Sequence, residues 1–141
     1  VRDLAAPSGV CLIWSVASKL PDACDLIASW GYDYRGVFLT WIKTTAAGKP
    51  ALGTGLYHRS NTEFLIFGVR GQVTPLLSGV HDASGILTAP RTRHSEKPAE
   101  THARVEYVFG GPGVQKRCEL FARGAAADLP DGWTGWGDQL A

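Results

Sequence analysis

The sequence predicts an α/β fold in which strands and helices alternate around one sheet. Two amphipathic stretches of helical length lie between short apolar runs rich in β-branched residues, at 10–16, 37–42, 63–69 and 117–121. With 141 residues, 45% hydrophobic and 19% charged, the chain can bury a core and lacks the composition of a disordered segment. We therefore expect one domain over residues 1–141.

The first expected strand is the run Val10 to Val16 (VCLIWSV), whose uniform apolarity predicts a central strand that is buried on both faces. A helix is expected from Leu20 to Trp30, because Pro21 and Asp22 both suit a helix amino terminus. Gly31 provides the stop for this helix. Its expected buried face consists of Leu20, Ala23, Ile27 and Trp30.

Two further runs, Val37 to Ile42 and Glu63 to Val69, predict an antiparallel hairpin at the edge of the sheet. About 20 residues rich in Gly, Thr and Ser join them, a length that usually signals a functional loop. A short extended run follows at Gly85 to Ala89, and Pro98 opens a second helix that ends near Phe109. The last expected regular element is the strand Arg117 to Phe121.

Composition excludes several classes of protein. No apolar stretch reaches the roughly 18 residues of a membrane span, and the first 20 residues do not resemble a signal peptide, so we expect a soluble cytoplasmic protein without membrane contact. Cys11, Cys24 and Cys118 are odd in number and lie among apolar neighbours, which predicts reduced core thiols. The four histidines show no metal-ligand spacing, so no metal is expected.

The net charge of +1 conceals an uneven distribution along the chain. Residues 35–70 contain five basic side chains and one acid, Glu63, and a second basic cluster follows at Arg91, Arg93, His94 and Lys97. Such asymmetry permits a polyanionic partner, although a solvated surface explains it equally well. The glycines near Lys49 match neither a phosphate-binding loop nor a dinucleotide fingerprint.

Four segments of the chain form a specific pattern: CLIWSVASKLPDACDLIASWGYDYRGVFLTWIKT at 11–44, GLYHRSNTEFLIFGVRG at 55–71, APRTRHSEKPAE at 89–100, and CELFARG at 118–124 with WTGWGDQL at 133–140. In this order, they resemble the MT-A(70)-like family of adenine methyltransferases. The resemblance implies a Rossmann-like methyltransferase sheet with flanking helices. It also implies a permuted motif order, with catalytic residues first and the cofactor strand last.

The resemblance also implies a binding site for S-adenosylmethionine. Lys97, followed by Pro98, matches the family's neighbour of the cofactor carboxylate, while Phe121 and Arg123 match residues beside the ribose and adenine. Near the carboxyl terminus, Asp138 and Gln139 occupy positions where the family carries cofactor-binding amides. Asp138 replaces an asparagine and so lacks the amide's donors, which puts that contact in doubt.

On the target side, the resemblance implies Trp41, Lys43, Asn61 and Glu63 as neighbours of an extruded adenine. Arg59, Arg91 and Arg93 are then expected to contact phosphates, which gives affinity without base choice. Two plainer interpretations stay open: Trp41 as a core residue and Lys43 as a solvated residue at a strand end.

The family's catalytic tetrapeptide, Asp-Pro-Pro-Trp, has no match in residues 1–141, and we expect it upstream of Val1. The sequence therefore predicts an S-adenosylmethionine-dependent enzyme that methylates the exocyclic amine of adenine in nucleic acid, in DNA rather than RNA, but is inactive as this chain alone. A homodimer or heterodimer is compatible with this expectation. The alternatives are a non-catalytic nucleic-acid-binding partner of an active methyltransferase and an unrelated α/β domain with a small-molecule role.

Overall fold

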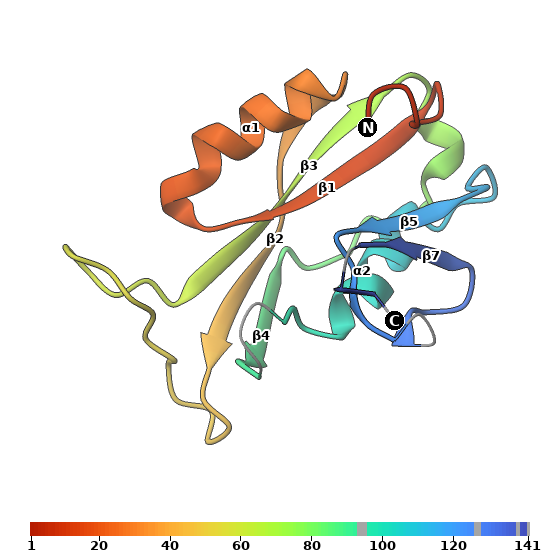
Figure 1. The fold of residues 1–141 in the computed structure, drawn as a ribbon. Helices are drawn as coiled ribbons and strands as arrows, with labels where there is room; N and C mark the ends of the chain where they lie inside the picture. The colour runs from red at the N-terminus through yellow and green to blue at the C-terminus, as the bar shows by residue number, and fades with distance from the viewer. Residues whose placement is uncertain (93–95, 126–127, 138, 141) are drawn as a thin grey trace.

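The computed structural model describes residues 1–92, 96–125, 128–137 and 139–140 and has a mixed α/β fold (Figure 1). Its helices are α1 (Leu20–Ser29) and α2 (Glu100–Phe109), with short 3₁₀ helices η1 (Ala17–Lys19) and η2 (Thr74–Leu76). Its strands are β1 (Gly9–Ser15), β2 (Asp33–Thr44), β3 (Thr62–Arg70), β4 (Ile86–Pro90), β5 (Arg117–Leu120), β6 (Arg123–Gly124), β7 (Trp133–Trp136) and β8 (Gln139–Leu140). Among the described helices, none is long and apolar enough to cross a bilayer.

The main sheet has four strands in the order β1-β3-β2-β4. β3 runs antiparallel to both β1 and β2, and only β2 and β4 are parallel. The prediction of a central first strand is therefore wrong, because within this sheet β1 pairs with β3 alone. Its side chains are only half-buried until Ser15, and Val16 is exposed. An apolar run of this length marks a strand but does not fix its position in the sheet.

The predicted hairpin of β2 and β3 is antiparallel, as expected, but it occupies the middle of the sheet and not its edge. β2 also begins at Asp33, four positions before the expected Val37. The register shifts between Tyr34 and Gly36, where Gly36 has a φ of 142°. Such a bulge accommodates a glycine and interrupts the alternation of side chains between the two faces of the strand. Because a strand is predicted from this alternation, the sequence pattern did not indicate the first residues of β2.

The sheet buries two apolar clusters, one on each face. On one face, Leu39 of β2 and Leu65 of β3 pack with Val105 of α2. On the other face, Ile66 packs with Ile27 of α1. Since successive side chains of a strand point to opposite faces, Leu65 and Ile66 assign the two helices to the two sides of the sheet. Trp41 belongs to the cluster on the α2 side.

α1 follows its sequence signals closely. It begins at Leu20 with Pro21 in its first turn and ends before Gly31, whose φ of 84° is the left-handed conformation that stops a helix. Ala23 and Ile27 are buried, as the helical spacing predicted. The helix lies close to β3 at Gly68, where an added Cβ would come within 2.5 Å of Cγ2 of Ile27.

The carboxyl-terminal residues form two small parallel pairs, β5 with β7 and β6 with β8. The prediction that Arg117 to Phe121 is the last regular element is therefore wrong, because the glycine-containing segment Trp133–Trp136 gave no strand pattern. Glu106 of α2 connects the β5–β7 pair to the helix. It accepts hydrogen bonds from the Arg117 guanidinium, one at 2.8 Å, and from Nε1 of Trp133 at 3.0 Å.

The three cysteines are free thiols, but they do not share one environment. Cys11 and Cys24 are half-buried, whereas Cys118 on β5 is exposed, so the prediction of core thiols is wrong for Cys118. Burial raises the pKa of Cys11 to about 11. β5 belongs to a two-stranded pair, which leaves one of its faces in solvent.

Candidate active site

One edge of the main sheet gathers several strand ends. The antiparallel register places Ser15, the last residue of β1, opposite Phe64, near the start of β3. β2 and β4 end together at the same edge, with Thr44 paired to Pro90. In open α/β sheets, ligands bind outside the carboxyl ends of strands. The carboxyl ends of β1, β2 and β4 therefore define where a site is expected.

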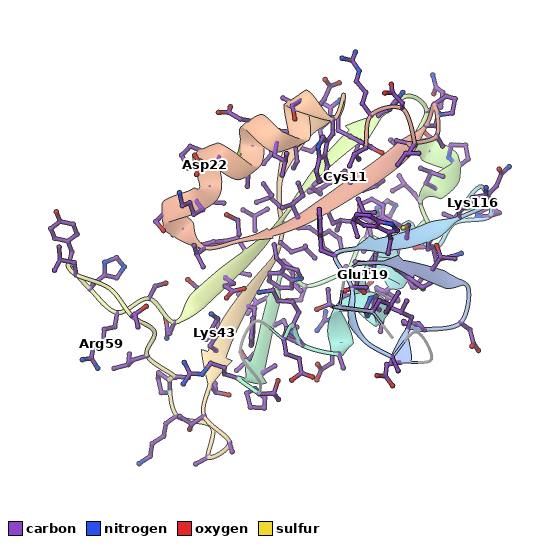
Figure 2. All side chains as sticks on the ribbon, in the orientation of Figure 1. Cys11, Asp22, Lys43, Arg59, Lys116 and Glu119 are labelled. Atoms are coloured by element: carbon purple, nitrogen blue, oxygen red, sulfur yellow. The ribbon has the colours of Figure 1, made fainter. Side chains whose placement is uncertain are left out.

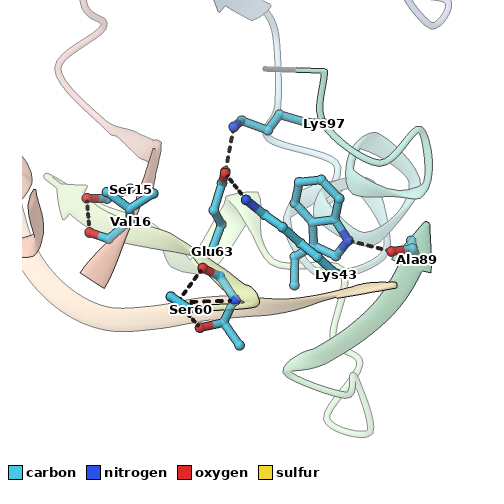
Figure 3. A network of polar contacts seen from close by, with 9 residues as sticks. Ser15, Val16, Lys43, Ser60, Glu63, Ala89 and Lys97 are labelled. Atoms are coloured by element: carbon cyan, nitrogen blue, oxygen red, sulfur yellow. Dashed lines mark hydrogen bonds and ion pairs between the residues drawn. The ribbon is translucent and has the colours of Figure 1, made fainter. Parts of the chain in front are cut away.

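At this edge, Glu63 accepts hydrogen bonds from two lysines that come from different elements (Figure 3). Nζ of Lys43 on β2 lies 2.5 Å from Oε1, and Nζ of Lys97, just before α2, lies 2.5 Å from Oε2. The Glu63 side chain is 12% exposed, and those of Lys43 and Lys97 are 17% and 31% exposed. The register explains the first contact, since Glu63 is opposite Trp41 and Lys43 follows on the same face of β2.

The charge state of Glu63 follows from these contacts. Burial alone raises the pKa of Glu63, but the hydrogen bonds and charges of Lys43 and Lys97 outweigh it and hold the pKa below its ordinary value. The carboxylate is therefore ionised at neutral pH. Two ammonium groups around one carboxylate leave a net positive charge at the edge of the sheet.

Two tryptophans form an aromatic wall behind these charges. Trp41 is 2% exposed and donates from Nε1 to the carbonyl of Ala89 at 3.0 Å. Trp14 of β1 meets it edge to face, with ring centroids 6.1 Å apart. Nζ of Lys43 lies 5.1 Å from the Trp41 ring and Nζ of Lys97 lies 5.7 Å from the Trp14 ring. Each lysine is thus positioned by one carboxylate oxygen and one indole.

The other residues expected on the target side lie around the same edge. The backbone carbonyl of Asn61 accepts a hydrogen bond from the N–H of Lys43 at 2.8 Å. Arg91 is exposed just after β4, and its N–H donates to the carbonyl of Thr44 at 2.8 Å. Figure 2 shows Lys43 near the end of β2 and Arg59 on the connection that follows. Arg93 and His94 lie outside the described residues.

The residues expected beside the cofactor follow β5. Phe121 has a φ of 61°, a left-handed conformation that is uncommon for a non-glycine residue. The Phe121 ring is exposed and meets the exposed ring of Trp136 edge to face, with ring centroids 6.0 Å apart. The backbones of Arg123 and Gln139 pair in β6 and β8. Asp138 lies outside the described residues.

Sequence reasoning missed three contributors to this region. Trp14 was hidden in an apolar run that indicated only a strand. Trp136 was noted as part of a motif, but its exposed pairing with Phe121 depends on backbone geometry. His102 of α2 contacts Glu119 of β5, Nε2 to Oε2 at 2.8 Å, and holds α2 against the strand that precedes Phe121. The one sequence signal for His102 is its position within the helix expected from Pro98 to Phe109.

The chain matches the sequence model of the MT-A70 family over residues 1–139. It is 28% identical over 140 residues to the Type II methyltransferase M.MunI of Mycoplasma sp, covering 99% of this chain and 54% of that protein. It is 29% identical over 153 residues to the N(6)-adenine-specific methyltransferase METTL4 of Mus musculus, covering 99% of this chain and 30% of that protein.

A third relative is the N6-methyladenosine RNA methyltransferase MTA1 of Cryphonectria parasitica, 28% identical over 144 residues, with 96% of this chain and 38% of that protein covered. The chain thus spans 30% to 54% of the length of these three relatives. The family match covers the strand edge that holds Lys43, Glu63 and Lys97, and it extends through both helices to β8. On this evidence the chain belongs to the MT-A70 family.

Proposed function

We propose that this chain is the larger part of a methyltransferase domain that transfers a methyl group from S-adenosylmethionine to the exocyclic amine of adenine in nucleic acid. The observation that carries the proposal is Glu63, which is held between Lys43 and Lys97 at the carboxyl edge of the sheet. A partly buried carboxylate whose pKa is shifted by specific charged partners is more common at functional sites than elsewhere on a protein. Membership of the MT-A70 family supplies the chemical class.

The chain's own residues fit the cofactor in two places. Lys97 lies three residues before the first residue of α2, where the helix amino terminus adds positive potential for a carboxylate. Its ammonium has three donors and gives one of them to Glu63, so donors remain for the cofactor carboxylate. Phe121 and Trp136 present exposed rings where an adenosine could stack, with Arg123, Asp138 and Gln139 proposed as neighbours. The bound cofactor supplies a methyl group activated on a sulfonium.

On the target side, we propose that Lys43 and Glu63 recognise the extruded adenine. Each oxygen of Glu63 accepts one hydrogen bond from a lysine and keeps a second lone pair for the amine of the base. Asn61 directly precedes β3, and its carbonyl accepts a hydrogen bond from the N–H of Lys43. Trp41 is buried and its indole N–H donates to Ala89, so its proposed role is to position Lys43 beside Glu63. This assignment combines the core interpretation of Trp41 with the functional one.

The proposed enzyme also needs the catalytic tetrapeptide, Asp-Pro-Pro-Trp, which residues 1–141 do not contain. We place it upstream of Val1, and we propose a Rossmann-like sheet in permuted order in which the catalytic segment precedes the cofactor strand. The amine of the base must lose one proton as its nitrogen gains the methyl group. Lys43, Glu63 and Lys97 then bind and orient the reactants, while the proposed tetrapeptide accepts the hydrogen bond from the amine that Glu63 does not.

We propose DNA as the substrate in preference to RNA, because the four motif segments look closer to those of the compact, single-domain members of the family, which act on DNA. The alternative is a non-catalytic partner that binds nucleic acid. The Asp138 position favours this alternative, since a carboxylate there cannot donate as an amide can.

A methyl-transfer assay tests the proposal. The full-length protein is incubated with isotopically labelled S-adenosylmethionine and adenine-containing DNA or RNA, and the nucleosides are then separated. We expect label in N6-methyl-2′-deoxyadenosine from DNA, and loss of that label in Glu63→Gln. Label from RNA alone would contradict the choice of DNA. Binding of nucleic acid and cofactor without any transfer would favour the non-catalytic partner.

A further inference from the structure

The connection between β2 and β3 forms an arm beside the candidate site. We define the β2–β3 arm as residues 45–61, which follow Thr44 and precede Thr62. Two hydrogen bonds attach its base to the sheet: N–H of Lys43 donates to Asn61 and N–H of Ala51 donates to Lys43, both at 2.8 Å. Ala51 is 5% exposed. The arm therefore starts from a fixed base whose anchoring residue, Lys43, also contacts Glu63.

The outer half of the arm is a narrow, folded-back structure. N–H of Gly53 donates to the carbonyl of Ser60 at 2.9 Å, which closes the two limbs. A Cβ at Gly53 would lie 2.5 Å from that carbonyl oxygen, and a Cβ at Gly55 would lie 1.9 Å from the carbonyl oxygen of His58. Only glycine permits such close approach, so the sequence specifies a thin arm with a tight tip. Figure 1 shows it reaching away from the sheet between β2 and β3.

The tip of the arm carries two large apolar side chains in solvent. Leu56 is 91% exposed and Tyr57 is 96% exposed. Neighbouring apolar side chains at a projecting tip contribute nothing to the core and are typical of interaction sites. Their neighbours His58 and Arg59 are exposed as well.

The charge of the arm selects among partners. Residues 44–62 contain no aspartate or glutamate, whereas Lys49 and Arg59 are basic. A basic, acid-free segment attracts a polyanion, and its exposed aromatic ring can stack on a base. An apolar tip on a purely basic arm fits nucleic acid better than it fits a second protein. A protein partner would explain the apolar tip but not the absence of acidic residues.

We infer that Leu56 and Tyr57 form a wedge that enters a nucleic-acid duplex at the step opened when the target adenine is extruded. This inference rests on the proposed function, because extrusion is what opens the stack. Proteins that distort a duplex insert apolar side chains between base steps in this manner. Tyr57 lies four residues from Asn61, so the tip reaches at most about 14 Å from the site at about 3.5 Å per residue. The tip therefore lies no more than about four base steps from the extruded adenine, within range of the step that the extrusion opens.

A binding experiment with a preformed gap tests the wedge without knowledge of the recognition sequence. Two short fluorescent DNA duplexes are compared, identical except that one has a single abasic site. The full-length protein is expected to bind the gapped duplex roughly tenfold more tightly, because the gap removes the unstacking cost and the wedge can fill it. The double variant Leu56→Ala, Tyr57→Ala should lose this preference and retain its affinity for the intact duplex within about twofold.

Leu4→Ala is the matched control, since Leu4 is 87% exposed but lies outside the arm, and it should behave as the wild type. Equal affinity of the wild type for both duplexes, with binding retained, would overturn the wedge and leave the proposed function standing. A change from dimer to monomer in the double variant, measured by light scattering, with its preference for the gap intact, would assign the tip to a protein interface and also overturn the inference. A wild type that binds no DNA or RNA would contradict the nucleic-acid function itself.

Discussion

Lys97 and Glu63 are 34 positions apart in the chain, yet Nζ of the lysine lies 2.5 Å from Oε2 of the carboxylate. The resemblance to adenine methyltransferases implied the lysine for the cofactor and the glutamate for the target base. Lys43 contacts the other oxygen of the same carboxylate. The expected cofactor site and the expected target-base site therefore share one cluster of charged side chains. A change at Glu63 should therefore affect both.

Replacing Glu63 with glutamine should destabilise the protein in a pH-dependent way. The pKa of Glu63 is lowered by folding from the ordinary value of 4.5, so its stabilising contribution is present above about pH 4.5 and is lost as pH falls through the lowered folded pKa. We expect the variant to be less stable by about 2 kcal/mol at neutral pH. Urea unfolding of both proteins at several pH values measures the difference. A difference that persists unchanged to about pH 3 would contradict the assigned charge state.

Replacing Lys97 with alanine should weaken the binding of S-adenosylmethionine roughly tenfold, since one charge-assisted contact to a carboxylate is lost. Calorimetric titration of the full-length protein provides the measurement. Lys49→Ala removes the same charge from the exposed β2–β3 arm and serves as the control. Equal affinities in the wild type and both variants would exclude Lys97 from the cofactor site.

The sequence predicted those elements whose signals are local. α1 was predicted from Pro21 at its start, Gly31 at its end and the buried face that includes Ile27. Sheet order depends on contacts between distant segments, so the apolar run of β1 could not reveal that β2 and β3 occupy the centre of the sheet.

The residues of the candidate site were also predicted one by one, whereas the contacts between them were not. The resemblance selected Lys43, Glu63 and Lys97 individually, but their common carboxylate depends on the register of β2 with β3 and on the path of the chain into α2. The left-handed conformation of Phe121 has no sequence signature because it occurs at a non-glycine residue.

The thiols should differ strongly in reactivity. With a pKa of about 11, only about one part in a thousand of Cys11 is thiolate at about pH 8, whereas Cys118 is exposed on β5. Brief treatment of the folded protein with iodoacetamide, followed by peptide mass mapping, should therefore show Cys118 labelled first. In urea, where burial is removed, the cysteines should react alike. Preferential labelling of Cys11 in the folded protein would contradict the packing of β1.

Replacing Gly68 with alanine should destabilise the packing of α1 on the sheet. The new Cβ would lie 2.5 Å from Cγ2 of Ile27 and 3.1 Å from the carbonyl oxygen of Asp33, so either the helix or the strand must shift. We expect a loss of about 2 kcal/mol in the free energy of unfolding. Gly85→Ala is the control, because its Cβ would meet its nearest atom at 3.7 Å. Equal stabilities of the two variants would show that α1 lies farther from β3.

Replacing Arg91 with alanine should weaken nucleic-acid binding evenly across sequences. Arg91 is exposed at the carboxyl edge of the sheet, just after β4, where a phosphate beside the extruded base would pass. A phosphate contact contributes affinity through counterion release, so its loss should lower the slope of log affinity against log salt by about one. Arg35→Ala provides the matched control, because Arg35 is also exposed but lies near the opposite end of β2, 3.7 Å from Asp33. An unchanged salt slope in Arg91→Ala, or an equal reduction in Arg35→Ala, would mean that the nucleic acid does not follow this edge of the sheet.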